Sequence, residues 1–168
     1  MIVTKQILQR GDSGVLQTLD LMKSYVNEYK DNLQIKGIVN KLSQNSNCNN
    51  KMQTIKNIFL YIVNNINYIP DPNNIELVKS AKHTILGSLK YGDCDDLSVA
   101  LATLLKAYGL KVWFRVVAWK RENGNDFTHV YVIVELPCKK YIMPLDPSMG
   151  EKGFGNEVKY FRKMDKEI

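Results

Sequence analysis

Three side chains of this sequence together have the residue types for covalent chemistry on an amide. Cys94 lies in the polar run Gly-Asp-Cys-Asp-Asp (92–96), just before an apolar pattern of helical period. His129 opens one β-rich run, and Asp146 closes another. Cysteine, histidine and aspartate in this order are the types of a thiol nucleophile, its base and the group that orients the base.

The expected position of Cys94 favours its reactive form. A thiol with the usual pKa of about 8.5 is mostly protonated at neutral pH, but a helix N-terminus favours the thiolate. His129 would accept the proton, and Asp146 would bond the far nitrogen of the ring and fix its tautomer. The peptide N–H of Cys94 is a natural donor to an oxyanion, and the candidates for a second donor are Tyr68 and His83.

Two acidic neighbours oppose this chemistry, because negative charge near a thiol disfavours the thiolate. We therefore expect the carboxylates of Asp95 and Asp96 to turn toward helix N–H groups or a cation, away from the sulfur. Asp93 is the expected N-cap, and Asp96 follows it by three residues in the pattern of a capping box.

Each of the three residues also has a less specific interpretation. A cysteine on a helix is commonly a small buried apolar residue. His129 alone would be a packing histidine, and Asp146 before a proline would be a turn residue. The three could instead bind zinc, with Cys138 as the fourth ligand, although the expected hairpin turn separates Cys138 from His129. The residues alone do not decide whether Cys94 is a catalytic or a structural cysteine.

Apolar spacing predicts the helices that would hold these residues. Helical period runs through residues 15–29, 35–42 and 55–66. It is clearest through 94–108, where Gly109 is placed to stop the helix. Cys94 would then lie in the first turn of the best-defined helix.

Three β-rich runs follow, at 111–120, 128–136 and 141–145, with a tight turn at 137–140. After them we expect a short final element with a frayed tail. Helices followed by an antiparallel meander predict an α+β fold, in which the helical N-terminal part packs on the sheet.

The spacing of the expected hairpin indicates how close His129 and Asp146 lie to each other. If its turn centres near Cys138, His129 lies across from residues 146 to 148. Asp146 is then directly or diagonally opposite His129 in the neighbouring strand, within reach of its side chain.

Length and charge bound the class of protein. The chain has 168 residues and a net charge of +6. This length predicts a single domain, 1–168, in which 1–50 would be an N-terminal helical segment. The lysines are scattered and no binding motif accompanies them, so we do not expect nucleic acid binding.

The cysteine count and the apolar runs indicate the cellular compartment in which the protein is expected. Three cysteines without a Cys-x-x-Cys spacing argue against a disulfide framework and a zinc finger, and Cys48 and Cys138 are interpreted as incidental thiols. No apolar run approaches the ~18 residues of a membrane span, and residues 1–6 lack a signal-peptide core. We expect a cytoplasmic protein with Cys94 reduced.

The three motifs resemble the transglutaminase-like superfamily, a branch of the papain-like cysteine peptidase fold. Its core has a Gly-x-Cys-x-Asp turn at a helix start, a His opening a strand and an Asp-Pro ending the next. Here these are residues 92–96, 128–132 and 144–148. The resemblance covers roughly residues 52–150. Tyr131 stands where many members have tryptophan.

A finer resemblance is to a subgroup found mainly in phages and prophages. It is carried by the Gly-Asp-Cys-Asp-Asp form of the cysteine turn, by Tyr-Ile-Pro-Asp-Pro at 68–72 and by Glu76. Animal transglutaminases are far longer, with extra β domains and calcium sites, so the resemblance does not imply calcium-driven crosslinking for this chain.

The resemblance implies a thiol-dependent amide hydrolase or acyl transferase acting on a peptide or protein, with Cys94, His129 and Asp146 as catalytic residues. It implies no cofactor and no metal. Phage structural proteins are the further expected partners, and the expected location is the host cytoplasm or the virion. The alternative is a non-catalytic virion or assembly protein that keeps the fold. An arylamine acetyltransferase uses the same residues but belongs to longer chains with a coenzyme A pocket.

Overall fold

The computed structural model describes residues 11–44, 51–72, 77–88, 90–119, 126–136 and 141–168. Cys48, Glu76, Cys138 and the turn expected at 137–140 lie outside the described residues.

The described helices follow the apolar periods of the sequence. They are α1 (Asp12–Tyr29), α2 (Leu33–Gln44), α3 (Lys51–Asn65), α4 (Ala81–Thr84) and α5 (Cys94–Ala107). The start of α2 shows the local cause, because the side chain of Asn32 accepts the N–H of Gln34 at 2.9 Å and so caps the helix. The brief α4 lies in a stretch that lacks a sustained apolar period.

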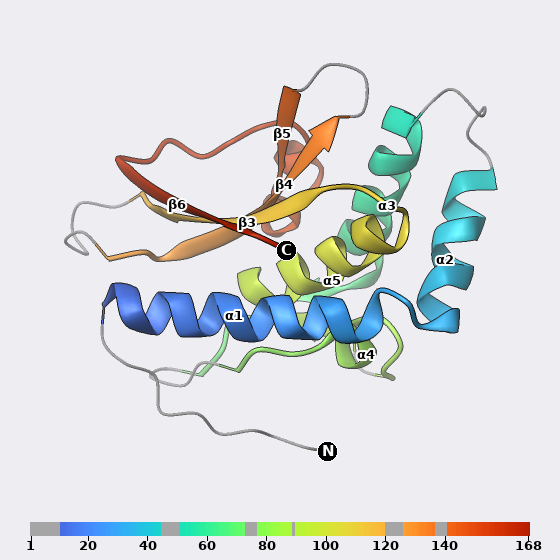
Figure 1. The fold of residues 1–168 in the computed structure, drawn as a ribbon, viewed down its shortest axis with the longest axis horizontal. Coiled ribbons are helices and arrows are strands. Elements are labelled where there is room, and N and C mark those ends of the chain that lie inside the picture. Colours follow the sequence, from blue (N-terminus) through green and yellow to red (C-terminus); the bar gives the residue numbers. More distant parts are fainter. Residues whose placement is uncertain (1–10, 45–50, 73–76, 89, 120–125, 137–140) are drawn as a thin grey trace.

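Helix α5 lies at the centre of the fold. Every residue from Asp95 to Leu105 is buried, which is the pattern of a helix enclosed on all sides. It packs on β4 and is flanked by α1, α2 and α3 (Figure 1). The helix stops where expected, because Gly109 has φ 88° and the N–H of Leu110 bonds the carbonyl of Leu105 at 3.1 Å.

Four antiparallel strands form the main sheet, in the order β5-β4-β3-β6. They are β3 (Val112–Ala118), β4 (His129–Leu136), β5 (Tyr141–Leu145) and β6 (Arg162–Glu167). Alternation along β4 sends Val130, Val132 and Val134 into the core with α5, while Tyr131 and Ile133 pack on the other face. The α+β class and the strands β3, β4 and β5 were therefore predicted correctly.

The C-terminal segment corrects the prediction of a frayed tail. The final element is β6, which pairs with β3 along its whole length. The end is held on both sides, because the N–H of Ile168 bonds the carbonyl of Val112 and the Nζ of Lys106 bonds the oxygen of Ile168 at 2.7 Å. A strand paired in this way does not fray, since its backbone donors and acceptors are satisfied in the ladder.

A second, two-stranded sheet leads the chain to Cys94. Strands β1 (Asn67–Tyr68) and β2 (Tyr91–Gly92) pair in parallel, with Tyr68 opposite Gly92. The pairing brings the proline-containing segment after α3 beside the turn before α5.

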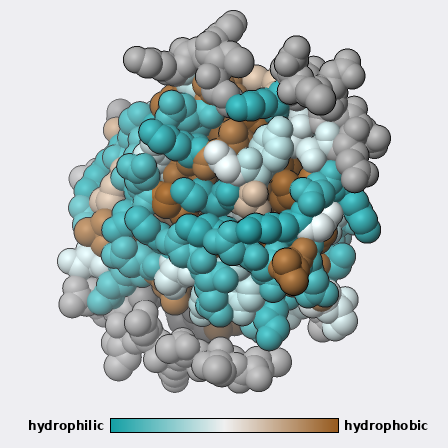
Figure 2. Space-filling model, turned by 45° about the vertical axis from the view of Figure 1, so that its right-hand side comes forward, coloured by the Kyte–Doolittle hydropathy of each residue, from teal (hydrophilic) through white to brown (hydrophobic). Residues whose placement is uncertain are grey.

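The N-terminal helices share one core with the rest of the fold. Leu19 of α1, Ile35 of α2 and Phe59 of α3 belong to the same buried cluster as the inner face of the sheet. On the face shown in Figure 2 the surface is largely hydrophilic, with apolar residues in small separate patches. Among the described residues, no helix has the length and apolarity to cross a membrane.

Phe59 tests how far the core supports the segment after β5. Its ring is fully buried and lies 5.4 Å from the ring of Phe154, in an edge-to-face arrangement. Phe59→Ala should lower the free energy of unfolding in urea by about 3–5 kcal/mol. The control Leu33→Ala, at a side chain that is 86% exposed, should change it by less than about 0.5 kcal/mol. Equal effects would contradict this placement of the core.

Candidate active site

Cys94 begins helix α5, as the sequence predicted. Asp93 is the N-cap, and its N–H donates to Asp96 Oδ2 at 3.4 Å within a capping box. The thiol is half-buried. The positive end of the helix dipole is therefore directed at the segment that carries the sulfur.

Gly92 makes this turn possible through close packing. A Cβ at residue 92 would lie 2.4 Å from Cβ of Asp96 and 2.6 Å from its Oδ2. Any larger residue would displace the carboxylate that closes the helix start, so the glycine is required by the approach of the backbone to Asp96.

The carboxylate of Asp96 is fully buried and paired with a cation. Lys79 forms an ion pair with it through Nζ, and the N–H of Lys79 donates to Asp96 Oδ1 at 2.6 Å. Burial raises the pKa of Asp96 to about 6, and the bonds to Lys79 only partly oppose this. Burial also opposes the charge of Lys79, but its pairing with Asp96 and Asp71 raises the pKa of Lys79 overall.

Both acidic neighbours of Cys94 are turned as expected. Asp95 Oδ1 accepts the N–H of Asp96 at 2.7 Å, and Asp96 faces Lys79 and the N–H of Asp93. Their charges are thus directed to helix N–H groups and a cation. The prediction that these two carboxylates turn toward helix N–H groups or a cation is confirmed.

His129 and Asp146 are joined directly. His129 Nε2 lies 2.6 Å from Asp146 Oδ2. Asp146 is 1% exposed, and its other oxygen accepts the N–H of Ser148 at 3.1 Å and the hydroxyl of Ser148 at 2.6 Å. Strand β4 pairs Val132 with Leu145, so His129 is diagonal to Asp146, one of the two placements that the hairpin spacing predicted.

The use of Nε2 decides the roles of the two ring nitrogens. Because Asp146 takes Nε2, Nδ1 is the nitrogen that remains for a second partner of His129. An ionised carboxylate at this position fixes the ring to the tautomer that carries its proton on Nε2.

Two aromatic rings also contact the imidazole. Trp119 stacks on His129 with ring centroids 5.7 Å apart and an angle of 30°, and Tyr131 lies at 5.7 Å and 36°. No local pattern in the sequence indicates the contact of Trp119, because that contact depends on how β3 ends beside the start of β4. Trp113 instead packs in the cluster on the outer face of the sheet.

Two contacts relate the start of α5 to this histidine. Ser98, one helical turn after Cys94, donates to the carbonyl of Val130 at 3.3 Å, the residue next to His129. Tyr68 lies on β1, and its pKa is raised first by burial and then by the negative charges of Cys94, Asp93 and Asp146. One phenol is therefore within electrostatic range of both Cys94 and Asp146.

The other candidate donor, His83, lies elsewhere. It is exposed on α4, and its Nδ1 is 3.1 Å from the hydroxyl of Ser80. Its surroundings fit a surface residue.

The sequence comparison decides the family. A model of the transglutaminase-like superfamily matches residues 39–147, which include the cysteine turn, the histidine strand and Asp146. The chain belongs to the transglutaminase-like superfamily. The match begins near the end of α2 and ends before the segment that leads to β6.

Solved structures of low sequence identity share the transglutaminase-like fold. A candidate cysteine protease from Cytophaga hutchinsonii aligns at 16% identity and a TM-score of 0.56, over 88% of this chain and 55% of that one. A candidate protease from Parabacteroides distasonis aligns at 20% identity and a TM-score of 0.54, over 71% of this chain and 24% of that one. The chain thus spans only part of each. No curated protein matches the sequence.

The zinc alternative is not supported among the residues that this structure describes. There, the side chains gathered closely enough to ligate a metal together are Asp93, Asp95 and Asp96. Cys94, His129 and Asp146 do not form such a group. In the transglutaminase-like chain this acidic group is paired with a cation through the ion pair between Lys79 and Asp96.

The buried Asp96 predicts a specific dependence of stability on pH. Its pKa is about 6 in the folded chain and near 4 in the unfolded chain. The stability that Asp96 contributes is therefore fully present below pH ~4 and is lost as the pH rises through ~6. The free energy of unfolding of the wild type, minus that of Asp96→Asn, should fall by roughly 1–3 kcal/mol from pH ~4 to ~7. Urea titrations at several pH values measure this difference.

Asp31→Asn is the matched control. Asp31 is exposed, and its bond to Lys36 lowers its pKa. The stability that Asp31 contributes is therefore lost only as the pH falls below the usual carboxyl range. The free energy of unfolding of the wild type, minus that of Asp31→Asn, should stay nearly constant from pH ~4 to ~7. If the Asp96 difference rose with pH, the Lys79 pairing would outweigh burial.

Proposed function

We propose that the protein is a thiol-dependent amide hydrolase or acyl transferase that acts on a peptide or protein through an acyl-enzyme on Cys94. The observation that carries this is the bond between His129 Nε2 and the buried Asp146. This bond leaves Nδ1 of His129 as the nitrogen for a second partner, in a ring with a defined tautomer. His129 lies on the strand against which the cysteine helix packs. The superfamily membership and the fold shared with candidate cysteine proteases support the same chemistry.

The reaction needs only groups of this chain and a nucleophile from solution. Nδ1 of His129 takes the proton of Cys94, and the thiolate attacks the amide carbonyl carbon. The C–N bond then breaks, and the leaving nitrogen takes the proton from the imidazolium. Water or an amine next gives a proton to Nδ1 and attacks the thioester, which releases the acyl group and restores the thiol. Asp146 holds the ring and stabilises the imidazolium throughout.

The tetrahedral intermediate requires donors for its oxyanion. We assign one to the peptide N–H of Cys94, because the first N–H groups of a helix point out of its N-terminus. We assign the second to the hydroxyl of Tyr68. Its raised pKa keeps the phenol protonated, and therefore able to donate, in the pH range where a thiolate acts.

We favour hydrolysis over transfer, because attack by water needs no second binding site, whereas attack by an amine donor does. The work on phage structural proteins that the subgroup resemblance implies remains part of the proposal. A peptide library, with Cys94→Ala as the control, would identify the substrate. If no condition gave turnover, the assembly protein without catalysis would replace the enzyme.

Alkylation tests the activation of the thiol without any substrate. With iodoacetamide between pH 5 and 9, Cys94 should react fastest of the three cysteines, with an apparent pKa well below the usual value of about 8.5. His129→Ala should raise that pKa toward ~8.5, because the ion pair is lost. Mass spectrometry of the adducts measures both. Slow and equal labelling of all three cysteines would favour the structural alternative.

Tyr68→Phe separates the oxyanion donor from thiol activation. Turnover of a peptide substrate should fall by about 10²–10³-fold, the usual effect of losing one donor. The rate of alkylation of Cys94 should stay within about threefold, because alkylation forms no oxyanion on a carbonyl. His83→Gln should alter neither rate. Unchanged turnover in Tyr68→Phe would remove Tyr68 from the site.

A further inference from the structure

A row of side chains crosses the outer face of the sheet at one register. Arg115 on β3 pairs with Tyr131 on β4 and with Asp165 on β6. Continuing the β4–β5 register by one residue puts Asp146 beside Tyr131 on its other flank. The row therefore runs from the edge strand β6 to the aspartate that binds the histidine.

Charged hydrogen bonds hold this row together. Arg115 donates from Nε and Nη2 to the two oxygens of Asp165, both at 2.6 Å, and from Nη1 to Glu157 at 2.7 Å. The hydroxyl of Tyr131 donates to the same oxygen of Glu157 at 2.6 Å. Arg115 is 4% exposed and Tyr131 fully buried. Burial and then the bond to Glu157 raise the pKa of Tyr131, so the phenol remains a donor.

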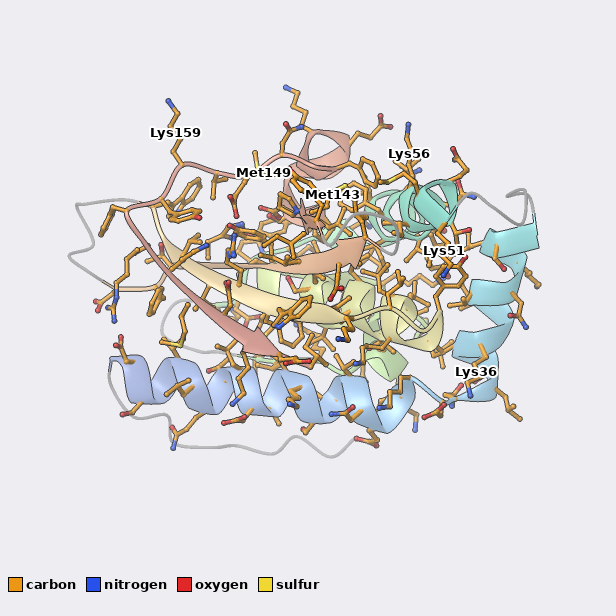
Figure 3. The ribbon with its side chains drawn as sticks, turned by 45° about the horizontal axis from the view of Figure 1, so that its top comes forward. Lys36, Lys51, Lys56, Met143, Met149 and Lys159 are labelled. Carbon is orange, nitrogen blue, oxygen red and sulfur yellow. The ribbon has the colours of Figure 1, made fainter. Side chains whose placement is uncertain are left out.

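The two carboxylates that bind Arg115 come from outside the family match. Glu157 lies in the segment that follows the 3₁₀ turns η2 (Pro147–Gly153) and crosses the outer face to β6 (Figure 1). Lys159 on the same segment points away from the sheet in Figure 3. The superfamily match ends at residue 147, so Glu157 lies beyond the matched residues.

We propose that Tyr131 is a positioning residue for His129, held by Glu157 and Arg115. The ring of Tyr131 lies 5.7 Å from the imidazole, and the hydrogen bond at its far end prevents it from turning away. A base that must keep Nε2 on Asp146 and Nδ1 toward a sulfur has to be held within about 10–20°. The assignment rests on the proposed role of His129, but its test does not require activity.

The imidazole itself gives the first readout. The chain has two histidines, so NMR of isotope-labelled histidine is easily assigned with His83→Gln. In a Cys94→Ala background, at pH ~8 where an ordinary imidazole is neutral, His129 should show one tautomer with its proton on Nε2. Tyr131→Leu should give averaged tautomers and faster exchange of that proton, and Tyr131→Phe, which keeps the ring but loses its bond to Glu157, should give a smaller change of the same kind.

Ile133→Ala is the control for packing alone. Ile133 is buried in the same cluster on the same face of β4, so its truncation should lower the melting temperature yet leave the His129 signals unchanged. If Tyr131→Leu lost stability but kept a single protected tautomer, Tyr131 would be a packing residue only and the proposal would be overturned.

Alkylation of Cys94 gives the second readout, in the unmodified active site. Tyr131→Leu should slow labelling at pH ~6 by about tenfold or more, since small misplacements of a catalytic group cost up to ~10²-fold. Glu157→Gln should also slow the labelling of Cys94, but by a smaller factor. If wild-type Cys94 labels as an ordinary thiol while the NMR changes occur, the proposed function fails and the positioning stands. If wild-type Cys94 is activated and neither Tyr131→Leu nor Glu157→Gln alters its labelling, the positioning role of Tyr131 is overturned and the proposed function stands.

Discussion

The carboxylate of Asp146 is almost fully buried, and a buried carboxylate is tolerated only when its oxygens are hydrogen-bonded. The chain meets this requirement on both sides. Pro147 opens a tight turn that returns the N–H and hydroxyl of Ser148 to one oxygen, and the start of β4 brings His129 to the other. The turn after β5 and the orientation of the histidine both serve to satisfy this one carboxylate.

A second buried carboxylate organises the other half of the site. Asp96 closes the start of α5, requires a glycine at residue 92 and holds Lys79. Through Lys79 it also joins the segment after β1 to the cysteine turn. Its raised pKa reflects the cost of burial. Ion pairs of this kind add little net stability, but they specify which segments meet.

The two halves are joined by the central helix. Because α5 is enclosed on all sides, its position relative to β4 is set by close packing on many side chains, and the hydroxyl of Ser98 adds a bond to the strand near His129. A nucleophile on such a helix and a base on such a strand are both on rigid elements, which is where functional geometry is held best. The exposed Trp119 and Tyr68 lie at the edges of this arrangement.

Much of the site could be predicted because it depends on short-range patterns. The capping residues, the helical period and Gly109 place Cys94 in a first turn, and the short hairpin between β4 and β5 limits Asp146 to positions near His129. The contacts of Lys79, Trp119 and Glu157 could not be predicted in this way. Each joins residues far apart in the chain, and no local pattern records a pairing that is decided by packing.

The sequence by itself determined the class of fold, the helix start that carries the cysteine and the strand pair that carries histidine and aspartate. These follow from periodicity and turn chemistry within a few residues. Only the tertiary structure decided that the last strand pairs with β3, that Lys79 forms an ion pair with Asp96, and that Glu157 bonds both Arg115 and the tyrosine next to the imidazole. These choices depend on strand pairing and on the burial of charge between distant segments, and both exist only once the whole chain is folded.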